Sequence, residues 1–141
     1  MRDINTALLK AYYSALADVG VPVYEGEEPD DVRDPIYIVM SDAVGLEQST
    51  KNSTDVQYTL QLSIHSWKNK YNNSADLNDV ASAVFEAIKP DSNSVLDLSA
   101  EGLQMMNLQV QTDRTERLGE MGGRVYISRI LIFKQDIFVI N

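Results

Sequence analysis

The chain offers few residues that could perform catalysis. His65 is its only histidine and it contains no cysteine, so a typical zinc site, a thiolate nucleophile and a disulfide are excluded. A serine hydrolase built on the Gly-x-Ser-x-Gly turn is excluded as well, because that pattern does not occur. Neither the Gly-x-Gly-x-x-Gly fingerprint nor the Gly-Lys-Ser/Thr phosphate loop is present. We therefore predict no catalytic residue, no cofactor, no metal site and no enzymatic activity.

Carboxylates are the one abundant type of reactive side chain. The chain has 21 acidic and 12 basic residues, and its formal net charge is −9 at pH 7. Many of the acidic residues fall between positions 25 and 34, but their spacing does not match a calcium-binding EF-hand loop. We interpret this segment as a solvated loop, with a cation site or a repulsive rim as the alternative. The acidic balance argues against tight DNA binding, which depends on Lys and Arg at the phosphates.

A length of 141 residues predicts one domain, spanning residues 1–141. A chain of this size buries roughly two thirds of its unfolded surface and needs no disulfide. The N-terminal residues lack the apolar core of a signal peptide. No apolar run approaches the roughly 18 residues that a membrane span requires, so we expect no membrane contact.

The first helix is expected over residues 4–19, where apolar residues recur at helical spacing. Asp3 is placed to cap this helix, and Gly20 is placed to end it. A short extended piece follows at residues 21–24. Its Pro22 suits a strand at the edge of a sheet, because proline cannot donate a backbone hydrogen bond.

A second helix is expected over residues 74–88. Its apolar residues fall at i, i+3, i+4, i+7, i+8 and i+11, which predicts one face packed against a sheet. Lys89 and Pro90 end the helix, since a residue before proline avoids helical geometry. The predicted packed face comprises Leu77, Val80, Ala81, Val84, Phe85 and Ile88.

Four segments have the residue pattern of strands, in two hairpins. The clearest is residues 56–67, in which apolar and polar side chains alternate. The polar residues 48–55 are expected to form the exposed loop of the first hairpin. Residues 114–123, rich in glycine and charge, are expected to form a mobile loop in the second. The expected strands span residues 36–47, 56–67, 103–112 and 124–133.

The order of helix, hairpin, helix, hairpin predicts an α+β fold. Two antiparallel hairpins would join into a single, mostly antiparallel sheet of about four strands, with two helices packed on one face (α-β-β-α-β-β). The piece at residues 21–24 would add a short edge strand.

Polar and apolar surfaces that lack an obvious partner favour assembly over catalysis. The polar row on strand 56–67 carries no charge, and suits either a protein–protein surface or the wall of a wet cavity. The apolar residues 137–140 either fold back on the sheet or dock on a neighbour, because chain ends are usually polar. The candidate assembly contacts are Ser49, Thr50, Lys51, Asn52, Gln57, Thr59, Gln61, His65, Ile137, Phe138, Val139 and Ile140.

Several segments, in this order, resemble the tail terminator, or tail-completion, proteins of long-tailed bacteriophages, which also serve at the head-to-tail neck. The resemblance covers most of the chain in layout and is specific between about Pro35 and Ile88. The segments that carry it are the N-terminal helix, Asp34-Pro35-Ile36-Tyr37-Ile38-Val39, Ser49-Thr50-Lys51, Leu62-Ser63-Ile64-His65-Ser66-Trp67, and the helix from Asn78 to Ile88.

This resemblance implies a structural virion protein that forms a homo-oligomeric ring, a hexamer, at the head-proximal end of the tail tube. Such a ring stops tube growth and joins the tail tube subunit to the head connector or neck proteins. DNA would cross its lumen without specific binding. The resemblance places the protein in the virion, at the tail or neck, after assembly in the host cytoplasm.

Two other readings remain open. The first is a small-ligand-binding or enzymatic α+β domain that uses the open polar face of the sheet, with the row from Gln57 to His65 lining the site. The second is a different virion part, such as a head-completion protein or a tube subunit. The mass of the protein in solution would distinguish a monomeric ligand-binding domain from an assembling protein.

Overall fold

We describe the protein from a computed structural model, which covers residues 4–26, 36–50, 53–69, 75–121 and 124–140. Helix α1 spans Ile4–Ala15 and continues as a 3-10 turn, η1, over Leu16–Asp18. Helix α2 spans Ala75–Ile88. Both helices lie where the sequence predicted them. Gly20 has a φ of 91°, a left-handed conformation that glycine adopts without steric cost, and it follows the end of the first helix as predicted.

The strands of the described residues form one sheet of six strands rather than the predicted four. The order is β1-β2-β4-β6-β5, and β3 also pairs with β4. All pairs are antiparallel except β1 with β2, so the short extended piece becomes a parallel edge strand. The strands span Val23–Glu25 (β1), Ile36–Met40 (β2), Val44–Thr50 (β3), Ser53–Asn69 (β4), Leu103–Met121 (β5) and Arg124–Val139 (β6).

Three predicted boundaries were wrong. The expected strand at residues 36–47 is two strands, β2 and β3, separated at residues 41–43. Most of the expected loop at residues 48–55 is strand, and so is most of the one at 114–123. Polar residues enter strands here because they pair with neighbouring strands over long ladders, and such tertiary pairing overrides weak strand propensity.

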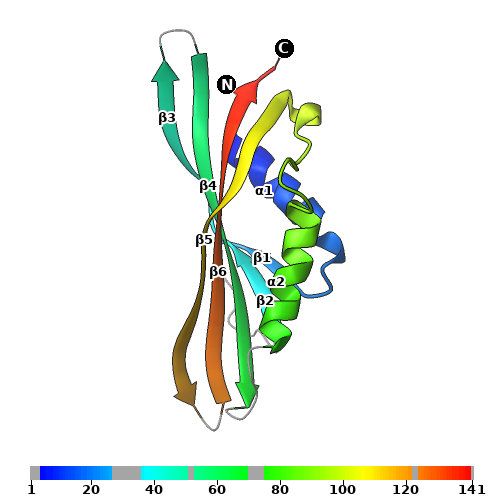
Figure 1. Cartoon of the computed structure of the whole chain (residues 1–141), viewed down its shortest axis with the longest axis vertical. Helices are drawn as coiled ribbons and strands as arrows, with labels where there is room; N and C mark the ends of the chain where they lie inside the picture. Colours follow the sequence, from blue (N-terminus) through cyan, green and yellow to red (C-terminus); the bar gives the residue numbers. More distant parts are fainter. Residues whose placement is uncertain (1–3, 27–35, 51–52, 70–74, 122–123, 141) are drawn as a thin grey trace.

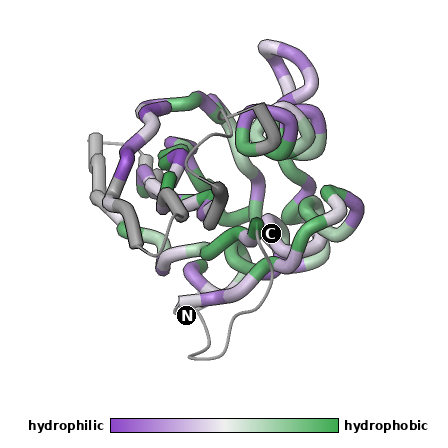
Figure 2. The backbone as a smooth tube through the Cα atoms, turned by 90° about the horizontal axis from the view of Figure 1, so that it is seen from below, coloured by the Kyte–Doolittle hydropathy of each residue, from purple (hydrophilic) through white to green (hydrophobic). Residues whose placement is uncertain are grey.

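Both helices cover the same face of the sheet, as predicted (Figure 1). From α2, Leu77, Val84 and Ile88 are buried, whereas Phe85 is only partly buried. The sheet contributes alternate residues of its two central strands to the same core: Leu60, Leu62, Ile64, Leu131 and Phe133. Viewed from below, the curved sheet and the helices surround this interior, and a hydrophilic loop projects outside it (Figure 2).

One polar network lies inside this core, between α1 and the sheet. The Tyr12 hydroxyl donates to Oε1 of Gln135, and Nε2 of Gln135 donates to the Tyr58 carbonyl oxygen at 2.8 Å. Both side chains are completely shielded from solvent. Each hydrogen bond offsets the desolvation of a polar group that would otherwise be buried without a partner. Burial raises the pKa of Tyr12 far above its ordinary value of 10.0.

We expect this raised pKa to make the fold sensitive to alkali. Above about pH 10 the unfolded chain loses the Tyr12 proton while the folded chain keeps it, so the stabilisation is complete below that pH and is lost above it. The slope contributed by one group reaches about 1.4 kcal/mol per pH unit. Tyr12→Phe should cost about 1–3 kcal/mol at neutral pH, because Gln135 loses a buried donor, but its stability should fall less steeply in alkali. Denaturant unfolding of both proteins from about pH 8 to pH 11 measures the two slopes, and equal slopes would contradict the assignment.

Candidate assembly surface

The predicted polar row lies on the face of β4 that points away from the helices. Gln57, Thr59, Gln61 and His65 alternate with core residues such as Leu62, and all four are partly buried rather than open to solvent. Within the row, Nε2 of Gln61 donates to Oγ of Ser63 at 3.0 Å. The row is therefore a more enclosed surface than the sequence suggested.

The row itself carries no charge, but the neighbouring strand β6 brings charged residues to the same face. In the β4–β6 register, Gln57 lies opposite Asp136 and Thr59 lies opposite Lys134. Directly paired residues of antiparallel strands point to the same face, so both charged residues share the surface with the row. Further along β6, Ile132 lies opposite Gln61. The surface thus combines amide, charged and aliphatic groups.

His65 is held within a cluster of aromatic and hydroxyl side chains on this face. Its Nδ1 shares hydrogen bonds with the Tyr126 hydroxyl and, at 2.7 Å, with Oγ of Ser128. The imidazole stacks on Tyr37 at 5.2 Å and on Tyr126 at 5.5 Å between ring centroids. Tyr24 of β1 then packs edge-on against Tyr37 at 6.0 Å. The cluster therefore links β1, β2, β4 and β6.

The Ser128–His65 pair resembles the nucleophile and base of a hydrolase only in composition. Ser128 is 1% exposed, and its hydroxyl lies against His65 within the aromatic cluster, so a substrate could not reach it in this arrangement. A nucleophilic serine needs an accessible oxygen beside its base. Among the described residues, no group of three His, Cys, Asp or Glu side chains could hold a metal ion.

The hairpin predicted to carry contacts is an extended arm, not a loop. β3 pairs with β4 without interruption from Val44 opposite Thr59 to Thr50 opposite Ser53. Ser49 and Thr50 are thus in a strand, while Lys51 and Asn52 fall outside the described residues. We call β3 with residues 53–59 of β4 the β3–β4 arm. It projects beyond both helices at one end of the molecule (Figure 1).

The apolar C-terminal segment divides between the core and the surface. Ile137 is buried and pairs with Met105 of β5 and Val56 of β4. The segment therefore folds back on its own sheet, one of the two alternatives. Val139 is nevertheless 59% exposed and Ile140 is 40% exposed. Val139 and Ile140 thus leave an exposed apolar surface at the end of β6, and Phe138 before them is partly buried.

Three cavities of about 450, 490 and 390 Å³ surround residues 92–101, which connect α2 to β5 and include the 3-10 turn η2 (Ser99–Glu101). Ile140 lines the first of them. Their lining residues come from α1, the connector, β5 and Ile140, which follows β6. None of these lining residues belongs to the polar row, so these cavities do not support a ligand site there.

Sequence reasoning missed the residues that join β6 to its neighbours. Tyr126 and Ser128 lie on β6 at the alternate positions that face His65, but only the strand register shows that they meet it. On the opposite face, Arg129 donates to Asp113 of β5 at 2.9 and 2.8 Å and to Asn78 of α2 at 3.1 Å. Hydrogen bonding from Arg129 lowers the pKa of Asp113 below its usual range.

Comparison with known proteins gives structural matches only. No family model and no curated protein sequence matches the chain. A chain in the solved structure described as "Virion of native gene transfer agent (GTA) particle" has a TM-score of 0.70 and 19% identity, over 98% of this chain and 99% of that chain. A second solved structure has a TM-score of 0.54 and 14% identity, over 94% and 92% of the two chains. These matches show a shared fold over almost the whole length.

No helix in the described part of the chain is long and apolar enough to cross a bilayer.

Proposed function

We propose that this protein is a structural component of a phage-like virion that acts by assembly, as a single domain, without catalysing a reaction. More specifically, we propose a tail terminator or tail-completion protein, which forms a ring at the head-proximal end of the tail tube and joins it to the head connector. The supporting observation is the fold similarity to a chain of a gene transfer agent virion, which extends over 98% of this chain and 99% of the other.

The shape of the protomer supports a role in assembly. Long strands extend beyond the helices at both ends of the sheet, with the β3–β4 arm at one end and the β5–β6 hairpin at the other (Figure 1). Val44, at the base of the arm, is 67% exposed. Such projections add contact area without enlarging the core, and rigid scaffolds commonly present functional segments in this way.

The surfaces suited to contacts lie at several places on the protomer. The polar row and the C-terminal residues Val139 and Ile140 occupy different parts of the sheet. Contacts between different surfaces of identical subunits are heterologous, and they close into rings when the rotation between subunits permits. We propose that Gln57, Thr59, Gln61, His65 and the arm contribute to such contacts, and that DNA passes the ring without specific binding.

The alternative of a small-ligand or enzymatic domain rests on the polar row alone. Its central residues are partly buried by their neighbours, and the His65 cluster fills the lower part of the same face. This arrangement favours a packed surface over an open binding site. A metabolite bound to the purified protein would support the small-ligand alternative.

Light scattering and negative-stain imaging of the purified protein test the proposal. We expect a discrete oligomer several times the 15.8 kDa protomer mass, with ring-shaped particles in projection. Dilution in low salt and in high salt serves as the control for nonspecific association, which salt would change strongly if it were driven by surface charge. A protein that stays monomeric alone and with tail tube subunits would contradict the proposal.

A further inference from the structure

The outer strands on one side of the sheet break at a defined level. β2 ends at Met40 and β3 begins at Val44, and both pair with β4. Between them, the Ser41 amide donates to the Gln61 carbonyl oxygen at 3.0 Å. The interruption therefore lies beside Leu60 and Gln61 of β4, and the ladder resumes on the other side of it.

The edge strand on the opposite side is irregular at the same level. β5 shifts register between Met106 and Gln109 and again between Val110 and Thr112. Across β6, Thr112 lies level with Ile132, and Ile132 pairs with Gln61. Two of the three register shifts of β5 and the break between β2 and β3 therefore fall in one band across the sheet, while the third shift, between Arg117 and Gly119, lies further along β5. We call it the twist band, formed by residues 41–43, 58–61, 106–112 and 132–136.

The sheet turns over through the twist band, so that the left-to-right order of its strands reverses (Figure 1). Above it, the strands run from left to right in the order β3, β4, β6, β5; below it, the order is β5, β6, β4 (Figure 1). The two ends of the sheet are thus viewed from opposite faces. An extra residue in one strand bends that strand and increases the local right-handed twist, so the irregularities account for the turn.

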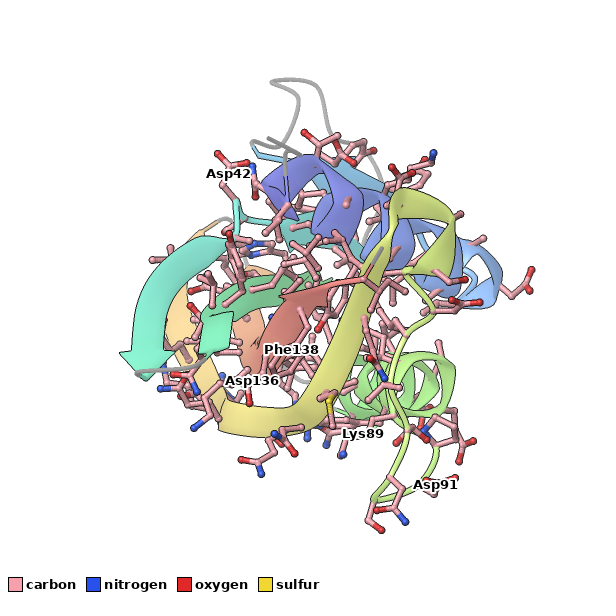
Figure 3. The ribbon with its side chains drawn as sticks, turned by 90° about the horizontal axis from the view of Figure 1, so that it is seen from above. Asp42, Lys89, Asp91, Asp136 and Phe138 are labelled. Carbon is pink, nitrogen blue, oxygen red and sulfur yellow. The ribbon has the colours of Figure 1, made fainter. Side chains whose placement is uncertain are left out.

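One side chain of α1 and one side chain from the residue that follows α2 bind the irregular backbone of the band. From α1, Oδ1 of Asn5 accepts a hydrogen bond from the Ala43 amide at 2.8 Å. At the end of α2, Nζ of Lys89 donates to the Leu108 carbonyl oxygen at 2.6 Å. Ala43 lies between two strands, and Leu108 has no partner in the β5–β6 register. Figure 3 shows Lys89 beside β5.

Further hydrogen bonds stabilise the interior and the edge of the twist band. Gln135 joins Tyr12 of α1 to the Tyr58 carbonyl oxygen at the level of the β5 irregularity. Asn107 has a φ of 56°, uncommon for a residue other than glycine, and its Nδ2 donates to Oδ2 of Asp136 at 2.9 Å. These bonds connect side-chain groups and one backbone carbonyl at the level of the irregular ladder.

We infer that Asn5 and Lys89 are positioning residues that set the angle between the two halves of the sheet, and so aim the β3–β4 arm. A bulged or broken ladder by itself allows several twist angles. Bonds from α1 and from the residue that follows α2 to opposite sides of the band restrict it to the angle at which both are made, since unpaired backbone groups are unfavourable when partly buried. This inference concerns the free protomer and does not depend on the proposed function.

Spin-label distance measurements test the inference directly. The chain has no cysteine, so Ser49→Cys on the arm and Ser82→Cys on the exposed side of α2 give one defined label pair across the band. A second pair, Ser82→Cys with Thr115→Cys, lies entirely below the band. Labelled chains are diluted with unlabelled chains so that distances between subunits do not contribute.

Asn5→Ala with Lys89→Met should shift or broaden the distance distribution of the pair across the band and leave the lower pair unchanged. Asn5→Asp and Lys89→Arg keep an acceptor and a donor, so they should reproduce the parent distribution. The single variant Asn5→Ala should also accelerate hydrogen exchange at the Ala43 amide several-fold, while Asn5→Asp should not. An unchanged distribution across the band, or an equal change in both pairs, would overturn the assignment.

Discussion

Replacing Phe133 by alanine should lower the free energy of unfolding by about 3–5 kcal/mol, the range expected for removing a fully buried aromatic ring. Phe133 lies on β6 with no exposed surface. Its ring contacts Tyr12 of α1 at 5.9 Å and Phe85 of α2 at 6.3 Å between centroids. Since one side chain joins both helices to the sheet, its loss leaves a cavity that no single element can close.

Phe85→Ala is the matched control, because it removes the same ring from the same cluster. Phe85 is partly exposed and also lies under the guanidinium of Arg129 at 5.8 Å. A loss of about 3–5 kcal/mol requires a fully buried ring. Because Phe85 is not fully buried, Phe85→Ala should lower the free energy of unfolding clearly less than Phe133→Ala does. The denaturant midpoints of both variants show which substitution lowers the stability more. A larger loss for Phe85→Ala would show that α2 is seated differently on the sheet.

Shortening the β3–β4 arm should abolish the joining of tails to heads, or the control of tail length, if the proposed function is right. Gln48 lies opposite Asp55 in the ladder, so replacing residues 49–54 with Asn-Gly restores a two-residue hairpin turn in the same register. The arm loses two residues from each strand, roughly 7 Å of reach. The core is untouched, so the thermal midpoint should change little.

The control for the shortened arm keeps its full length and changes only the turn. Lys51→Asn with Asn52→Gly installs the same Asn-Gly pair without removing any ladder residue, and this variant should assemble normally. Complementation of a strain that lacks the gene, with electron microscopy of the particles, measures the outcome. Normal tails and full infectivity from the shortened protein would show that the arm has no role in assembly.

Helical periodicity proved the most dependable signal in this sequence. The stripe from Leu77 to Ile88 predicted α2 and its packed face, because five or six apolar residues at one spacing leave a single way to bury them. The alternation in residues 56–67 predicted the central strand for the same reason. Val80 and Phe85 of this stripe are only partly buried, and Phe85 also lies against the guanidinium of Arg129.

The lengths of the outer strands could not be predicted from local sequence. Residues 114–121 are polar and contain glycine, so their propensity favours a loop, yet they pair with β6 as far as Met121 opposite Arg124. Residues 48–50 and 53–55 behave in the same way. A polar strand forms when a neighbouring strand supplies its hydrogen bonds, and that neighbour lies far away in the sequence.

Composition and pattern by themselves determined an α+β chain with two amphipathic helices, a central alternating strand and no motif for metal, phosphate or thiol chemistry. They did so because a helix or strand that buries one face has apolar residues at a regular spacing in its local sequence. The contacts of His65 with Tyr126 and Ser128, and those of Asn5 and Lys89 with opposite sides of one twist band, could not be read from the sequence. Those contacts depend on strand register and helix placement, which arise when segments distant in the chain pack together.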